Sequence, residues 1–418
     1  MALADYAAAF RSRKIALLLV LGFASGLPLA LTAGTLQAWL AADNVDIVAI
    51  GWFALVGQPY TYKFLWAPLM DRYAPPFLGR RRGWLLVTQL ALAAAIGFMG
   101  TLTPANSAWL LGAAAFTVAL LSASQDIVFD ALRADWLERE ERGAGAAVSV
   151  LGYRIAMLVS GAGALILADQ WLGWQATYWL MAALMGVGMA AAWLAVEPEP
   201  GGEAPRTLDA AVVKPFAEFF TRQGAVAILL LVVLYKLGDA FAGNLTTTFL
   251  LRGPGFSLTE VGAINKGFGL AATIFGALAG GALMAKMRLY RALLLFGVLQ
   301  AITNLGFMLL AASGKSYALM VAVIGLENLC GGMGTAAYVA LLMALCDRRF
   351  SATQYALLSA LSAVGRVYVG PVAGYLVAGF GWQPFFFFSF LIALPGLALL
   401  VWMRARIDAL DDGSAPAR

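Results

Sequence analysis

The chain has 418 residues, of which 62% are hydrophobic and only 12% charged, and its net charge is +5. Such a composition lies outside the range of soluble domains, so most of the molecular surface is expected to face lipid. The sequence contains no histidine, which excludes His-based catalytic triads and Cys/His metal sites; we expect no enzymatic activity, metal or cofactor.

Twelve apolar stretches are each long enough to cross a bilayer, which takes roughly 20 residues. They predict an all-α membrane protein with twelve transmembrane helices. In the first stretch, Gly22, Gly26 and Pro28 indicate close packing and a bend. The predicted spans, in chain order, are 15–40, 48–70, 84–103, 108–130, 146–168, 175–196, 225–250, 259–284, 290–312, 317–345, 352–378 and 384–403.

Lys and Arg residues cluster in alternate links between these stretches, and this pattern indicates the orientation of the chain. Positive charges in short loops are retained on the cytoplasmic side, and by this rule about 21 of the 28 lie on one side. Arg252 and Lys315 fall in links on the other side. Both termini are therefore predicted to be cytoplasmic, and the basic balance reflects topology and not nucleic-acid binding.

The link after the second stretch places an acid at the end of one helix and several arginines before the next. It resembles the signature loop of major facilitator carriers, in which such residues hold the cytoplasmic helix ends together in one state. A conformational latch is one interpretation, and a plain topogenic basic loop is the other. The latch residues would be Asp71, Arg72, Arg80, Arg81 and Arg82.

The fourth stretch carries two acids on one helix face, because Asp126 and Asp130 are spaced i, i+4. Gln125 lies beside them, and Arg154 is expected at a similar depth in the fifth stretch. We predict a pair between Asp126 and Arg154, which either serves transport or joins the helices structurally. Asp130 is equally consistent with an interfacial structural acid.

A polar segment at 197–222 divides the chain into two halves that echo each other. The tripeptide Gly-Trp-Gln opens the sixth stretch at 173–175 and the twelfth at 381–383. The repeat predicts the major facilitator fold, in which two six-helix bundles bind substrate between them near mid-membrane. The expected parts are 1–196, a cytoplasmic linker at 197–222, 223–405 and a cytoplasmic tail at 406–418.

Ionisable residues inside apolar stretches are costly at mid-bilayer unless they face a cavity or a partner, so they mark candidate functional positions. The proton-coupling candidates are Asp126, Asp239 and Glu327, and a salt bridge that joins helices is the competing interpretation of each. Embedded cations outnumber these acids, which favours an anionic substrate. The substrate-binding candidates are Gln37, Lys63, Gln125, Asp130, Arg154, Lys236, Asn244, Lys266 and Arg366.

Several stretches of the sequence are shared with one family of carriers: LVGQPYTYKFLWAPLMDRY with FLGRRRGW, SASQDIVFDALRAD and ERGAGAAVSVLGYRIAMLVSG. They resemble the AmpG muropeptide permease family, a branch of the major facilitator superfamily, over nearly the whole chain. The resemblance implies a multi-pass carrier of the bacterial inner membrane that imports GlcNAc-1,6-anhydroMurNAc peptides with protons for cell-wall recycling.

In many species such import also feeds the signal that induces a chromosomal β-lactamase, and with it antibiotic resistance. The resemblance thus implies an anhydromuropeptide and protons as the transported partners, and we expect the carrier to be a monomer. The alternative is a major facilitator carrier of another large anionic conjugate, such as acetyl-CoA.

Overall fold

The computed structural model describes residues 13–137, 142–198, 224–346 and 351–411, and these residues form helices and turns without a β-strand. The prediction of an all-α fold is confirmed for this part of the chain. Its residues fall into two compact units. Unit 1 comprises 13–45, 56–137, 142–198 and Ser257–Ala263, and unit 2 comprises Asp46–Leu55, 224–256, 264–346 and 351–411.

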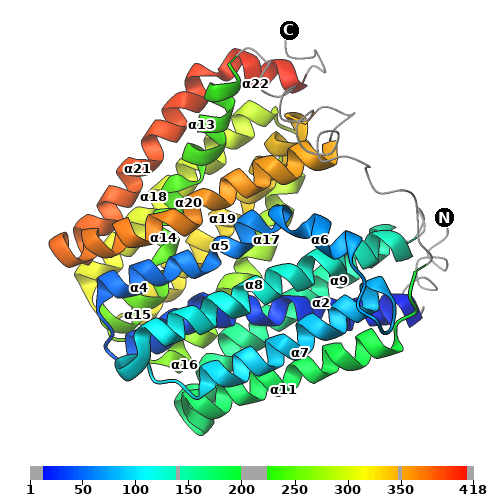
Figure 1. Cartoon of the computed structure of the whole chain (residues 1–418). Coiled ribbons are helices and arrows are strands. Elements are labelled where there is room, and N and C mark those ends of the chain that lie inside the picture. Colours follow the sequence, from blue (N-terminus) through cyan, green and yellow to red (C-terminus); the bar gives the residue numbers. More distant parts are fainter. Residues whose placement is uncertain (1–12, 138–141, 199–223, 347–350, 412–418) are drawn as a thin grey trace. The chain divides into compact units, whose positions relative to one another are not determined.

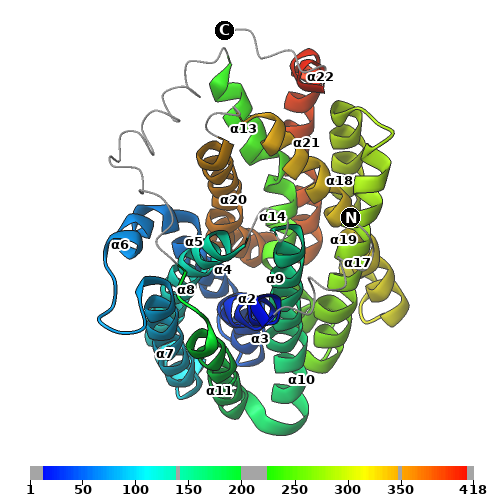
Figure 2. The ribbon, with the colours of Figure 1, turned by 90° about the vertical axis from the view of Figure 1, so that its right-hand side faces the viewer.

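Unit 1 is built around α2 (Arg13–Thr32), which packs along α8 (Pro104–Trp136) and α9 (Arg142–Met157), as Figures 1 and 2 show. α7 (Arg80–Gly100) contacts both α8 and α11 (Gly173–Leu194). The other elements that contribute to unit 1 are α3 (Gly34–Ala42), η1 (Ala54–Gly57), α5 (Gln58–Tyr62), η2 (Lys63–Leu65), α6 (Ala67–Arg72), η3 (Leu158–Gly163), α10 (Ala164–Leu167), η4 (Ala168–Leu172) and α16 (Leu258–Glu260).

Glycines of the first predicted span allow α2 and α9 to approach closely. A Cβ atom on Gly22 would clash with the carbonyl of Ser149, and one on Gly26 would lie 2.6 Å from the carbonyl oxygen of Tyr153. The predicted close packing of this span is therefore confirmed. Any larger side chain at either position would push the two helices apart.

Unit 2 packs α18 (Leu289–Ser313) against α19 (Tyr317–Ala344) and α21 (Trp382–Trp402), while α17 (Gly269–Met284) also lies on α19. A Cβ atom on Gly276 of α17 would clash with the carbonyl of Leu329, so this contact depends on glycine. The other elements that contribute to unit 2 are α4 (Ile47–Phe53), α13 (Ala225–Tyr235), α14 (Leu237–Asn244), α15 (Thr246–Arg252), η6 (Val261–Phe268), α20 (Ser351–Phe380) and α22 (Arg404–Asp411).

Ten helices of the described chain are long and apolar enough to span a membrane, so the protein is a multi-pass membrane protein. One of them, Gly145–Leu194, covers two predicted spans and turns at Gly173, where φ is +67°. The predicted span 48–70 is instead a series of short helices. Pro59 and Pro68 lie in the first turns of two of them, because proline is tolerated there but breaks a longer helix.

The first and seventh predicted spans are also interrupted. α2 gives way to α3 at Ala33. α14 gives way to α15 at Leu245. In membrane carriers, discontinuous helices of this kind present backbone groups and helix ends at the binding site.

Two short segments each belong to one unit, whereas the residues before and after them in the sequence belong to the other unit. Asp46–Leu55 lies in unit 2, where a Cβ atom on Gly51 would clash with the carbonyl of Gly370 in α20. Ser257–Ala263 lies in unit 1, where Asp169 Oδ2 accepts hydrogen bonds from the Thr259 amide at 3.0 Å and hydroxyl at 2.6 Å. Each unit is thus completed by a segment from elsewhere in the sequence.

Candidate functional site

The polar centre of unit 1 is formed by Ser25 of α2 and Asp126 of α8, which we call centre 1. The Ser25 hydroxyl donates a hydrogen bond of 2.5 Å to Asp126 Oδ1. Ser25 is buried and Asp126 is half-buried among apolar helices. Arg154 contacts Met157 Sδ at 3.7 Å and makes no ion pair with Asp126 in the described structure, so the predicted pair of these two residues is wrong. A hydroxyl, and not a guanidinium, is the partner of this acid.

Asp130 lies one turn further along α8 and is more exposed than Asp126. Its carboxylate accepts a hydrogen bond of 2.9 Å from Arg133 on the same helix and lies 3.9 Å from Lys63 Nζ. The Asp130 side chain is 52% exposed, so these pairs are solvent-screened and contribute little to stability. The geometry favours the interfacial interpretation of Asp130 over a role at the deep centre.

Gln125 precedes Asp126 and is buried, yet neither its amide oxygen nor its nitrogen has a hydrogen-bond partner in the described structure. A buried amide without partners costs about 1–3 kcal/mol, so Gln125 has hydrogen-bonding capacity that a ligand can use. Gln37 is half-buried and follows the break in the first predicted span. Its backbone amide donates to the backbone carbonyl of Ala33. Gln125 is therefore a buried amide without a partner in the described structure, and Gln37 lies beside a break in a helix.

The polar centre of unit 2 is formed around Lys236, which separates α13 from α14; we call it centre 2. Lys236 Nζ lies 3.4 Å from Asp239 Oδ2, 3.4 Å from Gln300 Oε1 and 3.3 Å from Thr335 Oγ1. The side chains of Lys236 and Asp239 are 15% and 29% exposed. Lys236 and Asp239 thus form an ion pair, and a glutamine and a threonine that sequence patterns did not single out also contact the ammonium.

Lys266 and Glu327 make separate contacts in unit 2. Lys266 Nζ donates to Thr247 Oγ1 at 2.8 Å. Glu327 Oε2 accepts from Asn328 Nδ2 at 2.8 Å, and Asn328 Oδ1 accepts from Thr273 Oγ1 at 2.9 Å. Both side chains are half-buried. Each charge is therefore hydrogen-bonded by neutral polar groups, while Lys266 and Glu327 also attract each other electrostatically.

Asn244 and Arg366 are brought together by the end of α14 and the middle of α20. Asn244 Nδ2 donates to the backbone carbonyl of Arg366 at 3.1 Å. Arg366 is exposed and so is not buried among the apolar helices. The bond fixes the backbone at Arg366 without using its charge.

The predicted latch differs from the observed contacts. Arg81 Nε donates to Asp135 Oδ2 at 2.9 Å, and Arg82 donates to the carbonyls of Ala192 and Trp193 at the end of α11. Glu197 accepts from the backbone amides of Arg81 and Arg82 at 2.7 and 2.9 Å. An acid at a helix N-terminus is stabilised by the helix dipole.

The acids of this network are Asp135 and Glu197. The sequence pattern did not indicate them, because Asp71 is the acid nearest to the arginines in the predicted loop. Glu197 opens the polar segment after the sixth stretch, which was the available signal. Of the remaining latch candidates, Arg72 lies over the Tyr73 ring, Arg80 is half-buried, and the Asp71 side chain lies outside the described part of the structure.

Comparisons with known proteins decide the family of this chain. The sequence matches the profile of the Major Facilitator Superfamily over residues 18–326 and 238–418. It is 60% identical over 404 residues to the anhydromuropeptide permease of Escherichia coli (strain K12), a match that covers 97% of this chain and 82% of that protein. The chain belongs to the AmpG permease family of the major facilitator superfamily.

Further comparisons agree with this assignment. A putative transporter, AmpG 4 of Rickettsia felis, is 35% identical over 408 residues, which cover 96% of this chain and 98% of that protein. A crystal structure of a bacterial homologue of the human lysosomal transporter Spinster, inward-facing and unoccupied, aligns with a TM-score of 0.73 at 16% identity. That alignment covers 98% of this chain and 99% of the other and shows a shared fold.

The predicted AmpG resemblance is thereby confirmed, and this AmpG-family chain is a membrane transporter and not an enzyme. Its polar centres are accordingly those of a carrier.

Proposed function

We propose that this AmpG-family chain imports anhydromuropeptides across the bacterial inner membrane, coupled to protons, by alternating access of two six-helix bundles. The single observation that carries the proposal is the 60% identity to a protein named anhydromuropeptide permease, over 97% of this chain. In this proposal the chain crosses the membrane twelve times, the broken segment 48–70 is one crossing, and both termini are cytoplasmic.

The substrate would be held by cations that neutral groups position. Lys266 is fixed by Thr247, and the exposed Arg366 is anchored through its backbone to Asn244. A muropeptide stem carries carboxylates, and charge-assisted hydrogen bonds to Lys or Arg are stronger than neutral ones. Gln125, whose buried amide has no partner in the described structure, would then donate to a sugar or peptide group.

Asp126 and Glu327 are the stronger proton-site candidates of the three predicted acids. Each accepts a hydrogen bond from a neutral donor, Ser25 or Asn328, and neither forms a direct ion pair with a cation in the described structure. Asp239 instead neutralises Lys236 at 3.4 Å, and its protonation would leave a buried ammonium with neutral partners only. Asp239 therefore fits a structural or substrate-responsive role better.

Alternating access would require two segments to leave their present neighbours. Gly51 in Asp46–Leu55 would separate from Gly370, and Thr259 in Ser257–Ala263 would separate from Asp169. A short thiol-to-thiol cross-link between Asp169→Cys and Thr259→Cys, whose side chains meet at an exposed position, is expected to block uptake until the cross-link is cleaved. Continued uptake by fully cross-linked protein would refute this motion.

The substrate is tested by reconstituting the purified protein in liposomes under an imposed proton gradient. Uptake of a labelled anhydromuropeptide is expected, with competition by unlabelled anhydromuropeptide and none by acetyl-CoA. Dissipating the gradient with a protonophore should abolish accumulation but not exchange. Transport of acetyl-CoA alone would refute the proposed substrate, and accumulation that is indifferent to the gradient would refute proton coupling.

Orientation is tested separately by cysteine labelling in a variant that lacks Cys330 and Cys346. A cysteine at Lys14 should be protected from a membrane-impermeant thiol reagent in intact cells with a permeabilised outer membrane, whereas a cysteine at Lys315 should react. The reverse pattern would show that the basic links face outward and would overturn the proposed direction.

A further inference from the structure

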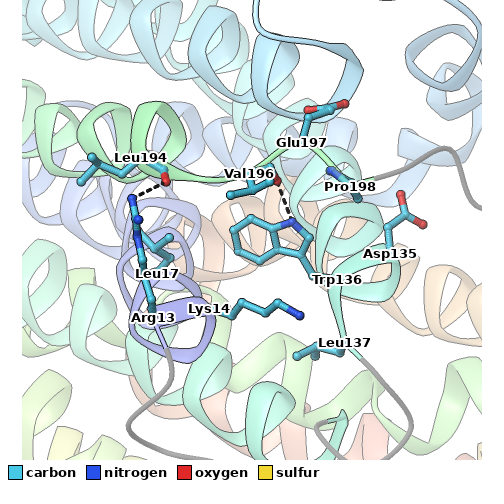
Figure 3. Close-up of a pocket in the computed structure, with 10 residues that line it drawn as sticks. All are labelled: Arg13, Lys14, Leu17, Asp135, Trp136, Leu137, Leu194, Val196, Glu197 and Pro198. Carbon is cyan, nitrogen blue, oxygen red and sulfur yellow. Dashed lines mark hydrogen bonds between the residues drawn. The ribbon is translucent and has the colours of Figure 1, made fainter.

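A cavity of about 560 Å³ lies at one end of unit 1, between the start of α2, the end of α8 and the chain that follows α11. Figure 3 shows how its side chains are arranged around the ring of Trp136. The cavity is lined by Arg13, Lys14, Leu17, Asp135, Trp136, Leu137, Leu194, Val196, Glu197 and Pro198. It is distinct from both polar centres, and nothing in the proposed transport mechanism uses it.

The charged groups of the cavity are divided between two sides. Arg13 and Lys14 occupy the first turn of α2, whereas Asp135 and Glu197 lie on the other side of the Trp136 ring (Figure 3). Both acids are engaged by α7: Asp135 accepts from the Arg81 guanidinium at 2.9 Å, and Glu197 accepts from backbone amides at its start. Both acids of the lining are therefore held by α7, on the other side of the Trp136 ring from the two cations.

The walls of the cavity are fixed by hydrogen bonds. Trp136 Nε1 donates to the Val196 carbonyl at 2.8 Å, and Arg13 Nη2 donates to the Leu194 carbonyl at 3.1 Å (Figure 3). These bonds tie the end of α8 and the start of α2 to the chain leaving α11. The cavity is consequently preformed, which lowers the entropy lost when a ligand binds.

The cavity lies at the level of the bilayer interface. Arg13 begins one candidate span and Leu194 ends another, so both helices emerge from the apolar layer here. Trp193 and Val196, which neighbour the cavity, are 61% and 68% exposed, and Trp is typical of the headgroup region. A ligand in this cavity would therefore meet water on one side and lipid on the other.

We propose that this cavity binds an anionic phospholipid, with its phosphate between Arg13 and Lys14 and its glycerol and upper acyl chains along the apolar wall. A guanidinium and an ammonium suit phosphate oxygens, since charge-assisted bonds to both shorten and strengthen the contact. Six of the ten lining residues are apolar, a surface that a soluble phosphate would leave unused. The mixed lining therefore favours a lipid headgroup over a free anion.

The test uses the full-length protein in dodecyl maltoside and measures its thermal unfolding midpoint as mixed micelles of phosphatidylglycerol are added. Wild-type protein should be stabilised by phosphatidylglycerol and not by phosphatidylcholine. Arg13→Gln with Lys14→Gln should raise the concentration needed by roughly tenfold. The control, Lys286→Gln with Arg291→Gln, removes the same charge from a basic link that does not line the cavity and should respond as wild type.

A second variant covers the possibility that the double substitution disturbs folding. Leu17→Trp keeps both cations and fills the cavity, and it should also lose the response to phosphatidylglycerol while retaining its unfolding midpoint without lipid. An unchanged response in both variants would overturn the site. An equal response of wild type to inorganic phosphate at matched ionic strength would overturn the lipid assignment in favour of a soluble anion.

Discussion

Centre 1 and centre 2 occupy comparable places in their units but are stabilised differently. Ser25 lies near the middle of α2, and Lys236 lies at the junction of α13 and α14, a similar distance from the start of its span. In centre 1 a hydroxyl donates to Asp126, whereas in centre 2 an ammonium contacts Asp239, Gln300 and Thr335. In the described structure, centre 1 therefore pairs an acid with a neutral donor, whereas centre 2 pairs a cation with an acid.

We expect the largest effect on transport at centre 1, for Asp126→Asn. The amide is nearly isosteric and its oxygen still accepts from Ser25, so folding should be retained. If Asp126 carries the proton, gradient-driven accumulation should fall by about 100-fold, the scale of a lost proton-transfer group. The measurement is uptake with and without a gradient in liposomes, with counterflow exchange as the control. Accumulation at the wild-type level would remove Asp126 from the proton path and leave Glu327 as the candidate.

At centre 2 the same type of change should lower stability as well as activity. Asp239→Asn leaves the Lys236 ammonium, which is only 15% exposed, with neutral partners, and we expect a loss of about 1–3 kcal/mol with roughly tenfold lower uptake. Lys236→Met added to Asp239→Asn should restore stability, because it removes the unmatched charge, but not uptake. Thermal unfolding of the three proteins in one detergent tests this. A double variant less stable than Asp239→Asn would contradict the assigned ion pair.

A smaller effect is expected when the donor of centre 1 is removed. Ser25→Ala deletes one hydrogen bond to a carboxylate, so uptake should fall several-fold, which corresponds to about 1 kcal/mol for the net contribution of one hydrogen bond. Ser160→Ala is a matched control, because that buried hydroxyl bonds only to the Ala156 carbonyl of its own chain segment at 2.9 Å. Equal losses in the two variants would mean that Ser25 contributes packing and not the positioning of Asp126.

The sequence predicted the class of fold, the family and the tight packing at Gly22 because these depend on composition and local pattern. The sequence shows which ionisable residues lie inside predicted spans, but it does not show which of them contact each other. Asp126 and Arg154 were expected to meet because their depths agree, yet depth does not determine which way a helix face turns. Ser25 and Gln300 were missed for a related reason: a hydroxyl or amide in an apolar helix looks unremarkable until its partner from a distant span is known.

The Arg81 and Asp135 ion pair at the edge of unit 1 gives a scale for the deep pair of centre 2. Its N–O distance is shorter, 2.9 Å against 3.4 Å, so distance alone would make it the stronger of the two. Burial agrees with distance, because the side chains of Arg81 and Asp135 are 9% and 24% exposed, against 15% and 29% for Lys236 and Asp239. Arg81→Gln should therefore cost about 1–3 kcal/mol, as Asp239→Asn does. Arg133→Gln is the control, because its partner Asp130 is 52% exposed and that pair should contribute only about 0.2–1 kcal/mol. In unfolding at low and high salt, the Arg133 contribution should shrink with salt and that of Arg81 should not. An Arg81 contribution that shrinks as much as that of Arg133 would show that the pair at the edge of unit 1 is screened by solvent.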